Sequence, residues 1–97
     1  MKFLAPWYET KDEALVAELH RELPEGHVLH GKPVKAMGRR EDRDQALFAL
    51  QDGTGRLAVV HLTFQVETDV SWPRFSMFGS EAEWIERMEV DHGEFEA

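Results

Sequence analysis

The chain has no cysteine among its 97 residues, which excludes disulfide frameworks, thiolate metal ligands and cysteine nucleophiles. It also lacks long apolar runs, because no segment approaches the roughly 20 apolar residues that a membrane-spanning helix needs. The start, MKFLAPWYET, has too short an apolar stretch before Pro6 for a signal peptide. No internal repeat, linker or low-complexity segment is present. We therefore expect one cytoplasmic domain spanning residues 1–97, with no membrane partner.

Positive charge is scarce, since 11 Lys and Arg stand against 19 Asp and Glu, for a formal net charge of −8. Phosphate backbones and anionic lipid surfaces repel such a chain, which argues against a nucleic-acid partner. The cations gather in residues 31–43, and the acids gather from Glu81 onward. We expect both segments to be solvated surface, although they could also attract one another between subunits.

Two segments have the pattern of a helix with an N-terminal cap. A capping-box pattern at Thr10–Glu13 precedes leucines at every fourth position, and Pro24 is expected to end that helix. The same pattern recurs at Ser80–Glu83, ahead of a second apolar stripe. Asp91-His92-Gly93 is expected to end this second helix.

Strand-like runs at 34–40, 46–51 and 57–66 lie between the two helices, separated by polar turns. The segment Asp52–Gly55 is a strong hairpin signal because its glycines tolerate positive φ. The sequence therefore predicts an α+β fold in a single domain. Its expected order is α-β-β-β-α, a three-stranded antiparallel meander with helices packed on the sheet.

The second hairpin allows a prediction of register. If Asp52 opposes Gly55, Phe48 faces Val59 and Ala46 faces His61. Both faces of the sheet would then be largely apolar, so each must be covered. Either the helices take one face each, or a second copy of the chain covers one of them.

Three short segments, AVVHLTF, WPRF and EAEWIERM, together resemble a group of short bacterial proteins. That group shares a VVHLT-aromatic strand, a Trp-Pro pair and an acidic C-terminal helix. The similarity covers Gly31 to Glu94, and Phe64 stands where the group has tryptophan. The resemblance implies a small α+β fold and indicates nothing about activity, because no catalytic residues are known for the group.

His61 is the residue in the strand-like runs that most resembles a functional group. Alternation along a strand places it on the same face as Leu57 and Val59. A half-buried imidazole can act as a base, a ligand or a pH sensor. It can equally be a packed ring with one hydrogen bond to the backbone, which is the interpretation that the sequence favours.

The remaining polar patterns predict no metal, cofactor or catalytic site. His27 and His30 are three apart in an extended segment and point to opposite sides, so they do not form a metal site with His61, Asp91 and His92. The carboxylate pairs Glu67 with Asp69 and Asp91 with Glu94 lie in polar segments and are interpreted as exposed charges. No serine lies in a G-x-S-x-G motif, and GTGR lacks the features of a phosphate loop.

The candidate ligand or partner surface consists of His61, Trp72, Arg74 and Phe75. Aromatic residues and arginine are enriched where proteins meet, although core packing is the default for aromatics. The sequence favours a non-catalytic protein that acts through contacts with a protein partner or as a homodimer. The alternative is a small-ligand-binding or enzymatic domain with a pocket around His61 and Trp72. Mimicry of nucleic acid by the acidic tail is a third hypothesis.

Overall fold

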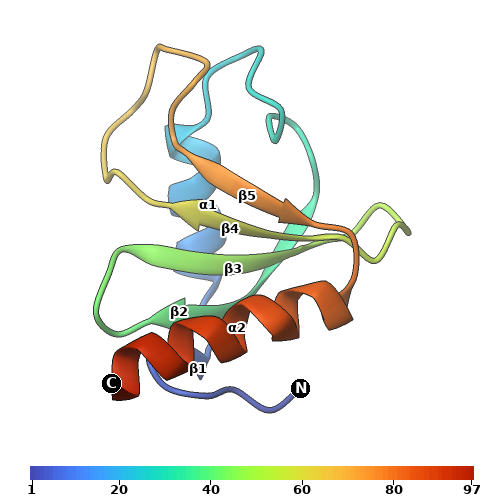
Figure 1. The fold of residues 1–97 in the computed structure, drawn as a ribbon. Helices are drawn as coiled ribbons and strands as arrows, with labels where there is room; N and C mark the ends of the chain where they lie inside the picture. Colours follow the sequence, from blue (N-terminus) through green and yellow to red (C-terminus); the bar gives the residue numbers. More distant parts are fainter.

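The computed structural model, which describes all 97 residues, has a five-stranded antiparallel sheet as its middle layer, with the strands side by side in chain order (Figure 1). The strands are β1 (Trp7–Glu9), β2 (Val34–Arg40), β3 (Gln45–Leu50), β4 (Leu57–His61) and β5 (Phe75–Phe78). Helix α1 (Glu13–Glu22) lies between β1 and β2 in the chain, and α2 (Glu81–Glu96) follows β5. The fold is α+β, as predicted.

The predicted three-stranded meander and the α-β-β-β-α order are incomplete, because a short strand is added at each edge. The meander of β2, β3 and β4 is present, but β1 pairs with the end of β2 and β5 pairs with β4. Edge strands of three and four residues are too short to show an alternating pattern.

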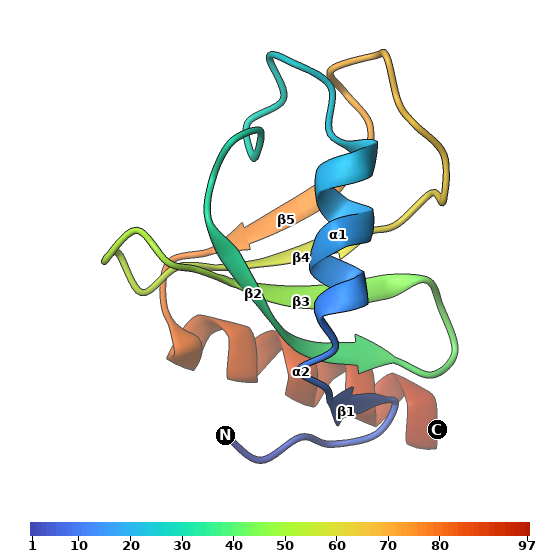
Figure 2. The same cartoon turned by 180° about the vertical axis from the view of Figure 1, so that it is seen from behind.

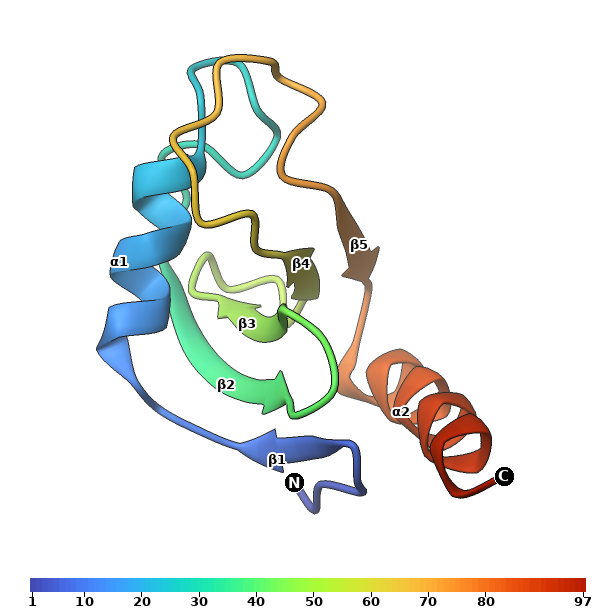
Figure 3. The same cartoon turned by 90° about the vertical axis from the view of Figure 1, so that its left-hand side faces the viewer.

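The two helices cover opposite faces of the sheet, which Figure 3 shows edge-on. Leucines of α1 and of the loop after it pack on one face against alternate residues of the central strands, including Phe48 and Val60. Trp84 and Met88 of α2 pack on the other face against Leu47, Val59 and their neighbours. Each apolar face is therefore covered within one chain, and neither requires a second copy.

The first helix begins later than the capping box predicted. Asp12 is the N-cap, and its side chain accepts a hydrogen bond from the Ala14 N–H. Thr10 cannot take this role because it still extends the β1–β2 pairing, where its N–H donates to Met37 O. The Thr10 hydroxyl instead accepts a hydrogen bond from the Asp12 N–H.

The second helix begins as predicted but ends later. Ser80 is its N-cap and accepts a hydrogen bond from the Glu83 N–H. The helix does not stop at Gly93 and continues to Glu96. Contacts of Asp91 and His92 with the N-terminal segment hold this last part against the sheet.

The predicted register of the β3–β4 hairpin is wrong by one residue. Leu47 pairs with Val59, Phe48 with Ala58, and Gln45 with His61. The slip arises because the Leu50 N–H donates to Arg56 O, which leaves a loop of residues 51–55 rather than a two-residue turn.

Strand β4 also ends at His61 rather than at Val66. The buried carboxylate of Glu22 accepts hydrogen bonds from the Thr63 N–H, the Thr63 hydroxyl and the Phe64 N–H, and so turns the chain away from the sheet. Beyond this point the loop of residues 62–74 runs beside the loop of residues 23–33, at the end of the molecule remote from β1 (Figures 1 and 2).

Candidate functional site

Polar side chains form one row across the sheet, on the face that α2 covers. Gln45 of β3 pairs with His61 of β4, and the His61 N–H donates to Arg74 O just before β5. Two residues along β4 from His61, Val59 packs beneath α2, so alternation directs His61 toward the same side. Arg40 of β2, the partner of Trp7, continues this row toward β1.

A pocket of about 450 Å³ lies over this row, between the sheet and α2. The pocket, which we call the His61 pocket, has eleven lining residues: Trp7, Gln45, Val59, His61, Ser71, Arg74, Phe75, Ser76, Phe78, Arg87 and Asp91. Its volume lies within the range of about 300–1,000 Å³ that is usual for small-molecule sites.

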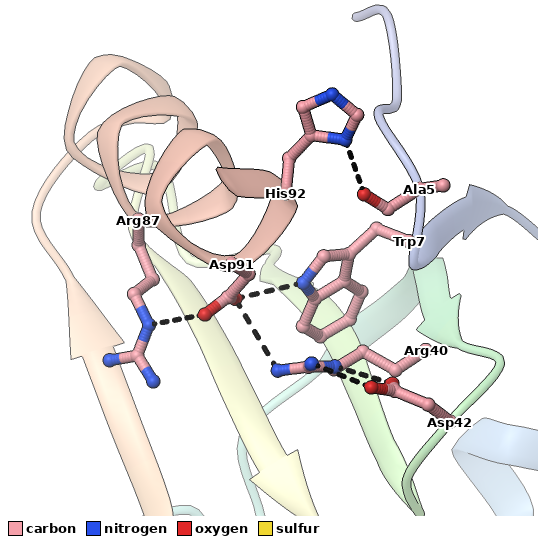
Figure 4. A network of polar contacts seen from close by, with 7 residues as sticks. All are labelled: Ala5, Trp7, Arg40, Asp42, Arg87, Asp91 and His92. Atoms are coloured by element: carbon pink, nitrogen blue, oxygen red, sulfur yellow. Dashed lines mark hydrogen bonds and ion pairs between the residues drawn. The ribbon is translucent and has the colours of Figure 1, made fainter. Parts of the chain in front are cut away.

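Asp91 is the buried anion at the edge of the His61 pocket, and Figure 4 shows its contacts. Its Oδ2 accepts a hydrogen bond from Trp7 Nε1 at 3.0 Å and lies 3.7 Å from the nearest nitrogen of Arg40. Its Oδ1 accepts a hydrogen bond from Arg87 Nε at 3.1 Å. Both oxygens are thus engaged by donors of the same chain, and Asp91 fixes the position of Arg87 one helical turn earlier.

Arg40 is buried and is shared between two carboxylates. It makes two hydrogen bonds to Asp42, at 2.8 and 2.9 Å, in addition to its ion pair with Asp91 (Figure 4). These hydrogen bonds hold the pKa of Asp42 below its ordinary value of 3.8. The guanidinium also lies 5.9 Å from the centre of the Trp7 ring. Arg40 therefore supports the wall of the pocket, and its positive charge is balanced by carboxylates of the same chain.

Arg74 is held differently, because its guanidinium lies 4.7 Å from the centre of the Trp72 ring and no carboxylate lies within 4 Å of it. A guanidinium over an indole face is attracted by the ring quadrupole without losing its charge. Trp72 itself does not line the pocket and supports Arg74 from outside it.

The structure thus places the four predicted site residues around one end of β4 and β5. His61, Arg74 and Phe75 line the pocket, and Trp72 contacts Arg74. The imidazole of His61 is exposed and makes no hydrogen bond within the chain, which differs from the packed ring that the sequence favoured.

Sequence reasoning missed Arg87 and misjudged Asp91, which was interpreted as an exposed charge. Asp91 is only 4% exposed. Arg87 and Asp91 are four apart on α2, a spacing that places both on one helix face and is the one signal that could have paired them. Nothing local showed that this face meets Trp7, which lies 84 positions earlier.

The histidines do not come together as metal ligands. No group of three or more potential ligands is present. His27 is buried with both ring nitrogens engaged, Nδ1 by the Leu29 N–H and Nε2 by Pro73 O. His92 donates from Nδ1 to Ala5 O (Figure 4).

The charge of the pocket lining favours an anion. Arg74 and Arg87 line it against the single carboxylate of Asp91, whose oxygens are already engaged. Arg87 uses Nε for Asp91, so its two terminal nitrogens have no partner in the chain. Guanidinium groups bind carboxylate and phosphate oxygens through paired N–H donors. The arrangement offers hydrogen-bond donors for an anion.

Neither helix is long and apolar enough to cross a membrane. No family model, no curated protein and no solved structure matches this chain.

Proposed function

We propose that this protein binds a small anionic molecule in the His61 pocket. The observation that carries the proposal is the charge at this site, because the pocket has an excess of cations in a chain whose net charge is −8. Arg21 and Arg56 each pair with an acidic neighbour, Glu18 and Asp52 respectively. Arg74 has none, and it is held on Trp72 at the rim.

The three side chains that can donate to an anion come from three different elements, which is the second support. His61 ends β4, Arg74 precedes β5, and Arg87 lies on α2. Both arginines are restrained, one by an indole and the other by a carboxylate. Restrained donors lose less side-chain entropy when a ligand binds. They therefore bind a ligand more tightly than mobile surface side chains would.

The test is an NMR titration of the protein with benzoate and, separately, with inorganic phosphate at constant ionic strength. We expect saturable amide shifts at His61, Arg74–Ser76 and Arg87 with at least one of the two anions. Arg74→Gln should weaken that binding at least about ten-fold, since a hydrogen bond to a charged group contributes about 1.5–3 kcal/mol.

Arg43→Gln is the matched control, because Arg43 is an exposed cation on the β2–β3 turn, outside the His61 pocket. This variant should bind like the wild type. Shifts that never saturate with either anion, or an equal loss of affinity in the two variants, would refute the proposal.

A protein-contact function is the second candidate, and it is favoured by exposed apolar side chains on the two adjacent loops. These are Val28, Phe64, Val66, Val70 and Trp72. Monomeric proteins seldom expose many large apolar side chains together, so such a group favours an interaction surface. Light scattering over a series of protein and salt concentrations tests self-association, and a constant monomer mass would exclude the homodimer.

A further inference from the structure

We infer that the ligand of the His61 pocket is an aromatic carboxylate, a singly charged anion with a flat apolar body. This inference rests on the proposed function and names its ligand class. It is drawn from three properties of the lining: the number of uncompensated charges, the apolar side chains within it, and the unpaired guanidinium of Arg74.

The charges of the lining match one negative charge. Arg74 and Arg87 together carry two positive charges, and Asp91 carries one negative charge. Arg40 is balanced separately by Asp42. One positive charge is left when His61 is neutral, so a carboxylate balances the site, whereas a phosphate monoester would leave negative charge uncompensated.

The lining includes an apolar part on the face that α2 covers, made of Trp7, Val59 and Phe78. The Phe75 ring is not part of it, because this ring packs on the opposite face of the sheet, against His27. Trp7 and Phe78 are fixed by edge-to-face contacts with Trp84, with ring centroids 4.8 and 5.9 Å apart. A compact inorganic anion would leave the accessible part of Trp7, Val59 and Phe78 in water, whereas a ring attached to the carboxylate would cover it.

Arg74 offers a second contact for a ring. Its guanidinium lies over the Trp72 ring, and its side chain makes no ion pair within the chain. A planar guanidinium stacks on aromatic rings through either face. Arg74 can therefore bind the carboxylate at its N–H edge or stack on the ring of the ligand, while Arg87 supplies further N–H donors.

The experiment compares four compounds by NMR titration at constant ionic strength. They are 3-phenylpropionate, acetate, inorganic phosphate and the neutral isostere 3-phenylpropanol. We expect 3-phenylpropionate to bind at least about ten-fold more tightly than each of the other three, because only it has both the charge and the ring.

Three results would overturn the inference, and they differ in what they say about the proposed function. If acetate or phosphate binds as tightly as 3-phenylpropionate, the aromatic class is wrong but anion binding stands. If 3-phenylpropanol binds as tightly, the site recognises rings and both statements are wrong. If none of the four compounds binds, both statements are also wrong.

The variant Arg74→Lys tests the stacking step, because lysine keeps the charge but lacks the flat guanidinium. We expect 3-phenylpropionate to lose about five-fold in affinity while acetate is unaffected, because a stacked cation contributes modestly at exposed sites. An equal loss for both compounds would contradict stacking. Lys35→Arg, on the exposed side of β2, is the control and should change neither affinity.

Discussion

The indole Nε1–H of Trp7 donates a 3.0 Å hydrogen bond to Oδ2 of Asp91, across 84 positions of the chain. The bond joins the first strand to the last helix, and both residues are buried. It holds α2 over the row of polar residues on the sheet. Helix α2 supplies Arg87 and Asp91 to the lining of the His61 pocket.

Removing the Asp91 carboxylate should destabilise the protein strongly. In Asp91→Ala the buried Trp7 N–H loses its acceptor, and Arg40 loses one of its two carboxylates. Breaking one partner of a buried pair costs about 3–5 kcal/mol, and the remaining contact with Asp42 reduces this, so we expect a loss of about 2–4 kcal/mol. Urea denaturation followed by circular dichroism measures it.

Glu89→Ala on the exposed side of the same helix is the control. Its free energy of unfolding should stay within about 0.5 kcal/mol of the wild type, as is usual for surface changes. If Asp91→Ala is as stable as this control, the buried network does not hold α2 in place.

Local patterns predicted the parts of the fold that depend on neighbouring residues. The leucine stripe of α1, the Ser80 cap of α2 and the three central strands follow from periodicity and turn residues. The remaining features of the fold depend on contacts between residues that are far apart in the sequence. Strand β1 needs β2 as a partner, and α2 continues through Gly93 because Asp91 and His92 bind the N-terminal segment.

From the sequence, only the part of the site on the sheet and its adjacent loop was predictable. Alternation along β4 placed His61 on the face of Val59, and Trp72-Pro73-Arg74-Phe75 marked the adjacent segment. Arg87 lies in a helix rich in acids, where an isolated cation resembles ordinary surface charge. Only the tertiary fold shows that its helix face lies over the sheet.

Glu22→Gln should alter the pH dependence of stability. Burial, followed by the neighbouring Glu18 carboxyl, raises the pKa of Glu22 above its ordinary value of 4.5. The Glu22 carboxyl therefore holds its proton more tightly in the folded state than in the unfolded state. The resulting stabilisation is fully present below pH 4.5 and is lost as the pH rises through the higher folded-state pKa.

We therefore expect the stability advantage of the wild type over Glu22→Gln to grow as the pH falls from 7 to about 4.5. At pH 7 the free energy of unfolding of Glu22→Gln should be about 1 kcal/mol below that of the wild type. A glutamine amide has only one oxygen and cannot accept the hydrogen bonds of both Thr63 and Phe64. Unfolding by urea at several pH values measures the difference. Exposed Glu25→Gln should show no trend, and a constant difference for Glu22→Gln would argue against the raised pKa.

The pKa of Asp52 should be unusually low for an exposed carboxyl. Hydrogen bonds from the Thr54 hydroxyl and N–H, followed by Arg56, lower its pKa from 3.8 to about 2. Its contribution to stability is therefore present above pH 3.8 and is lost as the pH falls through about 2. Carboxyl-carbon NMR measures the pKa directly. Thr54→Val should raise it, whereas Thr68→Val should not, and an unchanged value in Thr54→Val would assign the shift to another cause.

His27 should be a neutral ring with its proton on Nε2. The Leu29 N–H donates to Nδ1 at 3.0 Å, which requires that nitrogen to be unprotonated, and Nε2 then donates to Pro73 O at 2.9 Å. The ring thus joins the loop of residues 23–33 to the loop of residues 62–74 behind the pocket. Long-range ¹H–¹⁵N NMR at pH 7.5 distinguishes the two tautomers, and a proton on Nδ1 would contradict this arrangement.

His27→Leu removes both hydrogen bonds and leaves a buried N–H and a buried carbonyl without partners. Each such group costs about 1–3 kcal/mol, so we expect a loss of about 2–6 kcal/mol in urea denaturation. His30→Leu is the matched control because His30 is exposed in the same loop, and it should change stability by less than about 0.5 kcal/mol. Equal stability of the two variants would mean that these hydrogen bonds do not hold the two loops together.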